Sequence, residues 1–230
     1  VQKALYKTNV PVAKMYLYCE EESIIGTPFY VMEYLEGRVL EDTTLLGFNP
    51  EERTAIYDSM NKSLAALHNV NIEEVGLSDF GRPGSYFTRQ IKRWSSQWEL
   101  SKQHDMPEMP LLKDWLISNI PTSDETTIVH GDYRLGNLIY SLDEPKVIAV
   151  LDWELSTLGH PLADLGYNLM KRIISDFTGS INSIPTIIMP IPTYHYYFDG
   201  AKPIYRNFFN HFNDPKKNIY VFDILDDLKK

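Results

Sequence analysis

Hydrophobic residues recur with two different spacings along the chain. Residues 14–19 and 27–32 are short runs rich in aromatic and β-branched residues, joined by a segment rich in Glu and Ser, so they predict a β-hairpin. From Asn49 onward the spacing becomes helical. Asn49 and Pro50 have the residue types of a helix N-cap and first position. The apolar face predicted behind them consists of Ile56, Met60, Leu64 and Leu67.

Two further helices are predicted by stripes of aromatic and aliphatic residues. The first stripe consists of Phe87, Ile91, Trp94 and Trp98. The second consists of Leu112, Trp115, Leu116 and Ile120, and its helix is expected to end near Pro121. Such residues are more often core than ligand platforms, so we expect both stripes to be buried. A last helix is predicted to begin at Pro161.

Two β-branched runs between these helices predict short buried strands, at residues 128–129 and 147–151. Oxygen-bearing side chains stand where the runs stop: Asp132, Asn137 and Asp152. A loop can aim them at one point. Carboxylate and carboxamide oxygens suit Mg²⁺, which keeps phosphate oxygens among its ligands. The arrangement therefore indicates phosphoryl transfer.

The spacing of two of these residues supports that interpretation. Asp132 precedes Asn137 by the interval found in the catalytic loop of protein kinases, and His130 and Gly131 stand directly before it. Taken singly, Asp and Asn are more often turn-forming residues. The functional interpretation is favoured because Asp152 adds a third oxygen ligand at the place of the kinase metal-binding aspartate.

Bulk composition excludes several other classes of protein. The 230 residues are 43% hydrophobic, enough for a packed core, and the net charge of −9 lacks the basic footprint of nucleic-acid-binding proteins. The single cysteine, Cys19, allows no intrachain disulfide. No apolar run approaches the ~20 residues of a membrane span. No signal peptide is visible in the first residues.

At this point the motifs resemble a known family. The segments His130-Gly-Asp-Tyr-Arg-Leu-Gly-Asn137, Leu151-Asp-Trp-Glu154 and Pro161-Leu-Ala-Asp164 resemble the aminoglycoside phosphotransferase family. Over residues 147–164 the similarity is strongest to the kinase-like domain of acyl-CoA dehydrogenase family members ten and eleven. The resemblance implies an α+β, protein-kinase-like fold with an incomplete upper lobe and a mainly helical lower lobe.

The resemblance also divides the chain into three regions. We expect a remnant of the upper lobe and the hinge in residues 1–36, the lower lobe with the catalytic loop in 37–178, and a divergent tail in 179–230. No glycine-rich loop precedes the expected hinge, so the chain is expected to begin inside the upper lobe.

The resemblance assigns ATP and Mg²⁺ as cofactors and gives the motif residues roles. Asp132 is expected to act as the base or to orient the acceptor hydroxyl, and Asn137 and Asp152 to hold Mg²⁺. His130 is expected to brace the loop rather than transfer protons, and Arg134 to meet either a phosphate or a neighbouring acid. The residues expected along the nucleotide are Met32, Glu33, Tyr34, Leu35, Ile139 and Leu151. Loop support is expected from Asp164 and His160, and Glu154 either joins the metal site or faces solvent.

The acceptor expected from the resemblance is the hydroxyl of a 4-hydroxyacyl-CoA. A fused or associated acyl-CoA dehydrogenase domain and a peroxisomal or mitochondrial location are expected on the same ground. No partner nucleic acid or membrane insertion is expected. Two alternatives stay open: a nucleotide-binding or interaction fragment without turnover and, more weakly, a metal-dependent phosphohydrolase.

Overall fold

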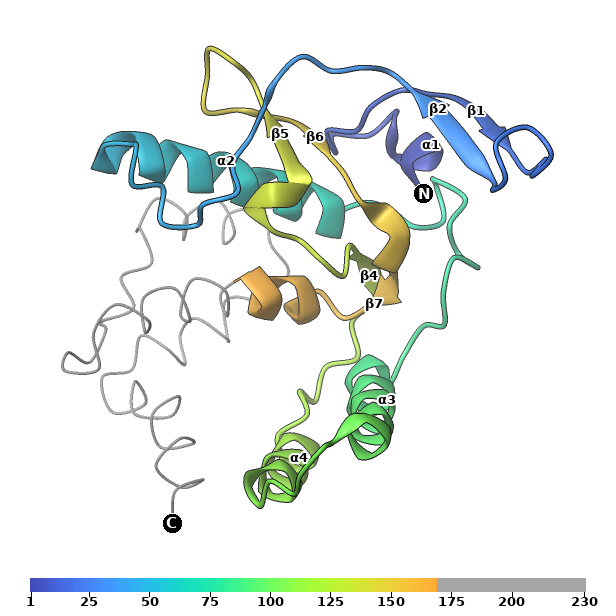
Figure 1. Ribbon diagram of the computed structural model, residues 1–230, viewed down its shortest axis with the longest axis vertical. Coiled ribbons are helices and arrows are strands. Elements are labelled where there is room, and N and C mark those ends of the chain that lie inside the picture. The colour runs from blue at the N-terminus through green and yellow to red at the C-terminus, as the bar shows by residue number, and fades with distance from the viewer. Residues whose placement is uncertain (169–230) are drawn as a thin grey trace.

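The computed structural model of the chain describes residues 1–168, in which helices and short strands mix (Figure 1). The labelled helices are α1 (Gln2–Leu5), α2 (Pro50–His68), α3 (Tyr86–Ser101) and α4 (Glu108–Ser118), and residues 162–168 are also helical. The strands are β1 (Met15–Cys19), β2 (Phe29–Met32), β3 (Arg38–Val39), β4 (Thr127–Val129), β5 (Leu138–Tyr140), β6 (Val147–Val150) and β7 (Thr157–Gly159). The predicted tail, residues 179–230, lies outside the described residues.

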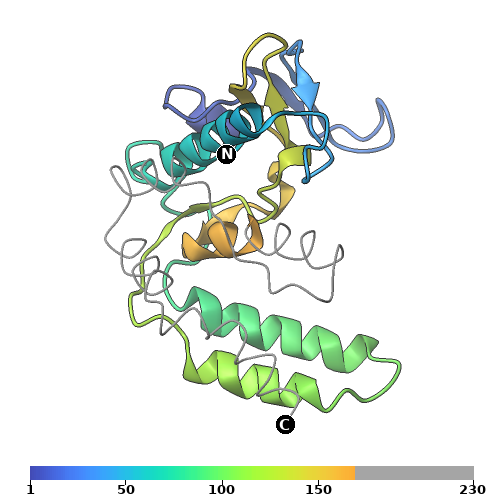
Figure 2. The same cartoon turned by 90° about the vertical axis from the view of Figure 1, so that its left-hand side faces the viewer.

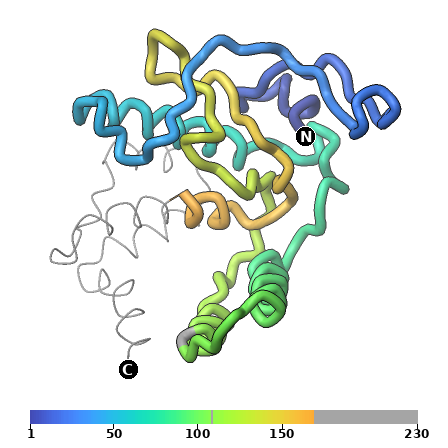
Figure 3. The backbone as a smooth tube through the Cα atoms, in the orientation of Figure 1, coloured from blue at the N-terminus to red at the C-terminus, as the bar shows by residue number. Residues whose placement is uncertain are grey.

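The predicted hairpin is confirmed, because β1 and β2 pair antiparallel with Cys19 opposite Phe29. Its strands carry large side chains that remain exposed, among them Tyr18 and Tyr30. In Figure 3 the chain leaves this hairpin, crosses above the remaining strands and descends to the start of α2. The crossing segment includes the expected hinge.

A three-stranded sheet lies at the centre of the molecule, with β5 between β3 and β6. Both pairs are antiparallel, and Ile139 of β5 faces Val39 on one side and Ala149 on the other. The segment before the hairpin also contributes, since the Val150 N–H donates to the Pro11 carbonyl oxygen at 2.9 Å. A separate antiparallel pair, β4 and β7, lies below it (Figure 1).

Helix α2 anchors the core. Its start is fixed by a reciprocal capping box, in which Asn49 accepts from the Glu52 N–H and Glu52 accepts from the Asn49 N–H. All four predicted apolar positions, from Ile56 to Leu67, are buried, which confirms the predicted face. Two buried tyrosines tie the strands and the catalytic loop to this helix. Tyr133 donates to the Met60 carbonyl at 2.7 Å and Tyr140 to the Ile56 carbonyl at 3.2 Å.

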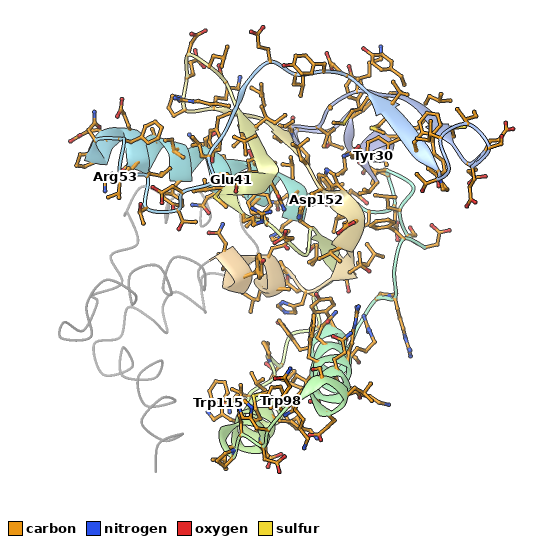
Figure 4. All side chains as sticks on the ribbon, viewed as in Figure 1. Tyr30, Glu41, Arg53, Trp98, Trp115 and Asp152 are labelled. Carbon is orange, nitrogen blue, oxygen red and sulfur yellow. The ribbon has the colours of Figure 1, made fainter. Side chains whose placement is uncertain are left out.

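The predicted burial of the two aromatic stripes is wrong. Helix α3 has no buried residue, and Trp94 is 60% exposed. Helices α3 and α4 lie antiparallel to each other below the sheets, away from α2 (Figure 2). Trp98 and Trp115 lie on this pair of helices (Figure 4). A helical stripe shows which side chains share a face, but two amphipathic helices that pack mainly on each other cover only part of those faces.

Candidate functional site

The catalytic loop links the end of β4 to the start of β5 and is shaped at Gly131. Gly131 has a φ of +89°, and an added Cβ would lie 2.7 Å from the Leu155 carbonyl oxygen. Other residues rarely adopt such a φ, and the backbone oxygen cannot move aside like a side chain. Glycine at this position therefore lets the loop backbone between His130 and Asp132 pass close to the backbone of Leu155.

The two carboxylate oxygens of Asp132 have different surroundings. Oδ2 accepts from Arg134 Nε at 3.2 Å and from Asn137 Nδ2 at 2.9 Å. Oδ1 is buried and has no hydrogen-bond partner within residues 1–168. Burial favours a higher pKa for Asp132, but hydrogen bonds from Tyr167, Asn137 and Arg134 outweigh it and lower the pKa below its ordinary value. Asp132 is therefore an ionised acceptor at neutral pH, with one oxygen fixed and the other unpaired.

Asn137 and Asp152 lie close together because they flank two neighbouring strands, Asn137 directly before β5 and Asp152 shortly after β6. The Leu151 N–H donates to the Asn137 carbonyl at 2.8 Å, and Asp152 follows directly. Asp152 has left-handed backbone angles, φ 63° and ψ 61°, an uncommon conformation for a residue other than glycine. The turn at Asp152 leads the chain out of β6 beside the catalytic loop.

These two residues fit a magnesium ion by the chemistry of their donors. Asn137 uses Nδ2 to donate to the Asp132 carbonyl and carboxylate, so its Oδ1, on the opposite side of the amide, is left for a cation. No three His, Cys, Asp or Glu side chains in the described part of the chain group as metal ligands. Two oxygen ligands are nevertheless typical of Mg²⁺ sites that phosphates and water complete.

His130 braces the loop from within the core. It is 0% exposed; its Nε2 donates to the Leu151 carbonyl at 2.8 Å, and its Nδ1 accepts the Asp132 N–H at 3.3 Å. The ring also packs against Trp153, 4.8 Å between centroids. Burial lowers the pKa of His130 despite nearby acids, which favours the neutral ring. These contacts fit the expected bracing role rather than proton transfer.

Asp164 supports the same loop through its backbone. Its Oδ2 accepts the His130 N–H and its Oδ1 accepts the Gly131 N–H, both at 2.8 Å. His68, at the end of α2, contacts Asp164 Oδ2 through Nε2 at 3.0 Å, and both side chains are buried. The sequence pointed to Asp164, whereas His68 was missed. The sequence feature that could have pointed to His68 is its position in the amphipathic helix α2, where this polar residue directly follows the apolar Leu67.

Arg134 pairs with acids in this structure. Its Nε contacts Asp132 Oδ2 at 3.2 Å, and its Nη1 lies 3.5 Å from Glu41 Oε2. Glu41 belongs to the segment between β3 and α2, and Figure 4 shows it close to β5. Of the two roles expected for Arg134, the structure displays the pairing with acids. Glu154 is exposed, as its solvent-facing alternative requires.

The residues expected along the nucleotide are partly brought together. An added Cβ on Gly37 would lie 2.3 Å from Ile139 Cγ2, so the residue that follows the expected hinge lies directly against β5. Glu33 accepts the Lys14 N–H at 3.3 Å, which ties the hinge to the segment before β1. Met32, Leu35 and Leu151 are partly buried, whereas the Tyr34 side chain is 89% exposed. A role for Tyr34 in the nucleotide site therefore depends on its backbone.

Comparisons with known proteins show what the chain is similar to. The sequence model of a family described as "Phosphotransferase enzyme family" matches residues 1–182. Human acyl-CoA dehydrogenase family member 11 is 46% identical over 168 residues, which cover 73% of this chain and 22% of that protein. Mouse family member 10 is 44% identical over 170 residues, covering 74% of this chain and 16% of that protein.

A solved structure is similar over a larger share of the chain. A protein from Ralstonia eutropha, described among the aminoglycoside phosphotransferases, is 50% identical, with a TM-score of 0.75 over 85% of this chain and 60% of that one. This likeness confirms the expected α+β, kinase-like fold. The chain thus spans about a fifth of the length of the human dehydrogenase family member that it matches. Within residues 1–168, no helix has the length and apolar character to cross a membrane.

Proposed function

Because the chain belongs to the phosphotransferase enzyme family and is an aminoglycoside phosphotransferase-like kinase, we propose that it moves the γ-phosphoryl group of ATP to the hydroxyl of a 4-hydroxyacyl-CoA. Phosphoryl transfer to a small molecule is the activity of the family. ATP as donor, Mg²⁺ as metal and the acyl-CoA as acceptor are the proposed parts. The Asp132 carboxylate is the observation that supports the proposal most directly.

Asp132 has the environment that an acceptor-orienting carboxylate needs. Arg134 and Asn137 hold Oδ2, so the buried and unpaired Oδ1 is the oxygen that gains most from a new donor. An acceptor O–H that donates to Oδ1 is held with its oxygen toward the phosphorus. Positioning of this kind accounts for most of the catalysis in phosphoryl transfer. The carboxylate takes the acceptor proton as the acceptor oxygen bonds to the γ-phosphorus and the bond from that phosphorus to the bridging oxygen of ATP breaks, which releases ADP.

Asn137 and Asp152 are the residues that would hold the magnesium ion. The ion supplies positive charge that offsets the charge on the transferring phosphoryl oxygens. The chain's own contribution is to keep the Asn137 amide oriented, through its two hydrogen bonds to Asp132. The same residue thus couples the acid that orients the acceptor to the metal position.

The acceptor class is proposed from the relatives. The matched human and mouse proteins are named acyl-CoA dehydrogenase family members, and this chain corresponds to 22% and 16% of their lengths. We propose that the remainder of such proteins supplies a dehydrogenase domain, fused or associated, that handles the same acyl-CoA. Phosphorylation turns a poor leaving group, hydroxide, into a good one and prepares the acyl chain for elimination. A peroxisomal or mitochondrial location is proposed on the same ground.

The test is transfer of radiolabelled γ-phosphate from Mg-ATP to 4-hydroxypentanoyl-CoA. Asp132→Asn keeps the shape of the side chain but removes the base, and kcat is expected to fall about 10²- to 10⁴-fold. Asp143→Asn, in the exposed turn between β5 and β6, is the matched control and should leave kcat unchanged. Equal rates for the parent and Asp132→Asn would overturn the proposal. ATP binding without transfer to any hydroxylated acyl-CoA would favour the alternative of a nucleotide-binding fragment.

A further inference from the structure

Positive charge is concentrated around one helix of this acidic chain. The whole chain carries 22 Lys and Arg residues against 31 Asp and Glu residues. Residues 82–102, which include α3, reverse this balance with five basic residues and one acid, Glu99. The five basic residues are Arg82, Arg89, Lys92, Arg93 and Lys102. A local surplus of positive charge attracts anionic ligands, so this helix is the part of the chain that favours an anion.

Only some of these cations are available to a ligand. Arg89 donates to two backbone carbonyl groups just before the helix, and Lys102 pairs with Glu99. Lys92 and Arg93 are exposed, and neither forms an ion pair with an acid within residues 1–168. Helix α3 therefore presents two adjacent cations to the solvent.

An exposed aromatic ring stands beside these cations. Trp94 is 60% exposed, and Cζ of Arg93 lies 5.7 Å from the centroid of its ring. An exposed indole offers a flat surface on which a nucleotide base can stack, and a guanidinium group pairs well with phosphate. Lys92, Arg93 and Trp94 together form the α3 face. This face combines recognition of an aromatic base with recognition of phosphate groups.

The start of α3 is fixed beside the strands that lead into the catalytic loop. An added Cβ on Gly159 of β7 would lie 2.5 Å from the Tyr86 ring, so this tyrosine packs closely on the strand. Phe87 packs against His160, with 4.9 Å between ring centroids. Gly159 in turn pairs with Thr127 of β4, the strand directly before the loop. The α3 face lies about two helical turns beyond this anchor, on a regular element rather than on a loop.

ATP does not account for the α3 face. The segment expected along the base of ATP crosses above the three-stranded sheet, whereas α3 lies below β4 and β7 (Figure 1). A second ligand with a base and phosphates is therefore required. CoA carries adenine, a pyrophosphate and a 3′-phosphate at one end, and its long uncharged pantetheine arm separates them from the thioester. The arm would allow the two ends of an acyl-CoA to reach different parts of the chain.

We propose that the α3 face binds the adenosine phosphate end of CoA while the acyl chain extends to Asp132. This inference rests on the proposed function, because it locates one part of the proposed acyl-CoA acceptor. The same cations repel a polycationic acceptor such as an aminoglycoside. The α3 face thus contributes to the choice of acceptor by attracting one class and disfavouring another.

The test measures the binding of CoA itself to the 230-residue chain by calorimetry, without ATP. Arg93→Gln should raise the dissociation constant about tenfold, because a hydrogen bond between charged groups is lost. Trp94→Leu should raise it by a similar factor, because base stacking is lost. Lys113→Gln is the matched control, since it removes an exposed charge from the neighbouring helix α4 and should leave the dissociation constant unchanged.

Kinetics give a second readout. Arg93→Gln should raise the KM for 4-hydroxypentanoyl-CoA by the same factor, with kcat and the KM for ATP unchanged. This division between KM and kcat marks the loss of a contact that is equally strong in the bound substrate and in the transition state. A substitution that merely disturbed the fold would lower kcat as well.

Several results would overturn the inference. An unchanged dissociation constant for CoA in either Arg93→Gln or Trp94→Leu would do so, as would an equal rise in Lys113→Gln. Tripolyphosphate that binds as tightly as CoA would also refute it, because the α3 face would then recognise charge alone. Absence of CoA binding to the parent chain would have the same meaning. Failure of the proposed function is seen separately, as unchanged phosphoryl transfer by Asp132→Asn, and CoA binding requires no transfer.

Discussion

His68 and Asp164 meet inside the protein, with Nε2 of His68 3.0 Å from Oδ2 of Asp164 and both side chains buried. The same carboxylate accepts the N–H groups of His130 and Gly131. The acid thus joins the end of α2 to the first residues of the catalytic loop. Two backbone donors and one imidazole satisfy a charge that is costly to bury alone.

Asp164→Asn should destabilise the chain and misplace the loop. The substitution keeps the shape of the side chain but turns an NH₂ group toward an N–H or imidazole donor, so we expect a loss of about 3 kcal/mol in the free energy of unfolding. Urea denaturation followed by circular dichroism measures it. Asp58→Asn, which removes one partner of the partly exposed pair with Lys62, should change stability by less than about 1 kcal/mol. A similar loss in both variants would contradict the anchoring role.

Gly131→Ala should impair both stability and transfer. The added Cβ meets the Leu155 carbonyl oxygen at 2.7 Å and forces a side chain into a φ of +89°. The expected loss is about 1–3 kcal/mol in the free energy of unfolding, with a large fall in kcat as Asp132 is displaced. Thermal unfolding and the phosphate-transfer assay give the two values. Gly47→Ala is the control, since an added Cβ there meets nothing within 4 Å. Gly131→Ala with parental activity would show that the loop tolerates another path.

Two substitutions at Asp152 should separate its charge from its backbone conformation. Asn adopts the left-handed conformation more readily than Ala does, so Asp152→Asn should keep parental stability while Asp152→Ala loses about 1 kcal/mol. Both variants should lose the stabilisation that Mg-ATP gives the parent. The measurement is the melting temperature with and without Mg-ATP. Undiminished stabilisation in Asp152→Asn would remove this residue from the proposed metal site.

Stability should fall at alkaline pH because of Tyr133 and Tyr140. Burial raises the pKa of both phenols far above the ordinary value of 10. A raised folded-state pKa contributes stability below the unfolded-state pKa and loses it as the pH rises, so the decline begins near pH 10. Tyr140→Phe should flatten it, at a cost of about 1 kcal/mol at neutral pH for the bond to Ile56. Urea midpoints from pH 8 to 11 test this, and an unchanged slope in the variant would count against it.

The sequence predicted the elements whose pattern is local. The hairpin and the apolar face of α2 follow from residue spacing alone. The grouping of Asp132 with Asn137 followed from the spacing within one loop. The aromatic stripes on α3 and α4 were misjudged, because a stripe does not reveal how much of it a neighbouring helix covers.

Contacts between distant segments were beyond a sequence pattern. His68 meets Asp164 across 96 residues, and neither position belongs to a recognisable spacing with the other. The bond from Tyr167 to Asp132 likewise depends on where the last described helical segment packs. Tyr167 contacts the catalytic loop itself, and His68 reaches the loop through Asp164. What the sequence missed is therefore the support of the site rather than its acidic residues.

The contacts of Asp164 imply an order of folding steps for a chain that is leaving the ribosome. The loop residues His130 and Gly131 are synthesised before Asp164, the acid that accepts their N–H groups. His68, which contacts the same acid, is synthesised earlier still. Contacts of such long sequence separation form late in folding, because the intervening loop must first close. The catalytic loop should thus acquire its final geometry only after residue 164 has been synthesised, so nascent chains halted earlier should not bind Mg-ATP.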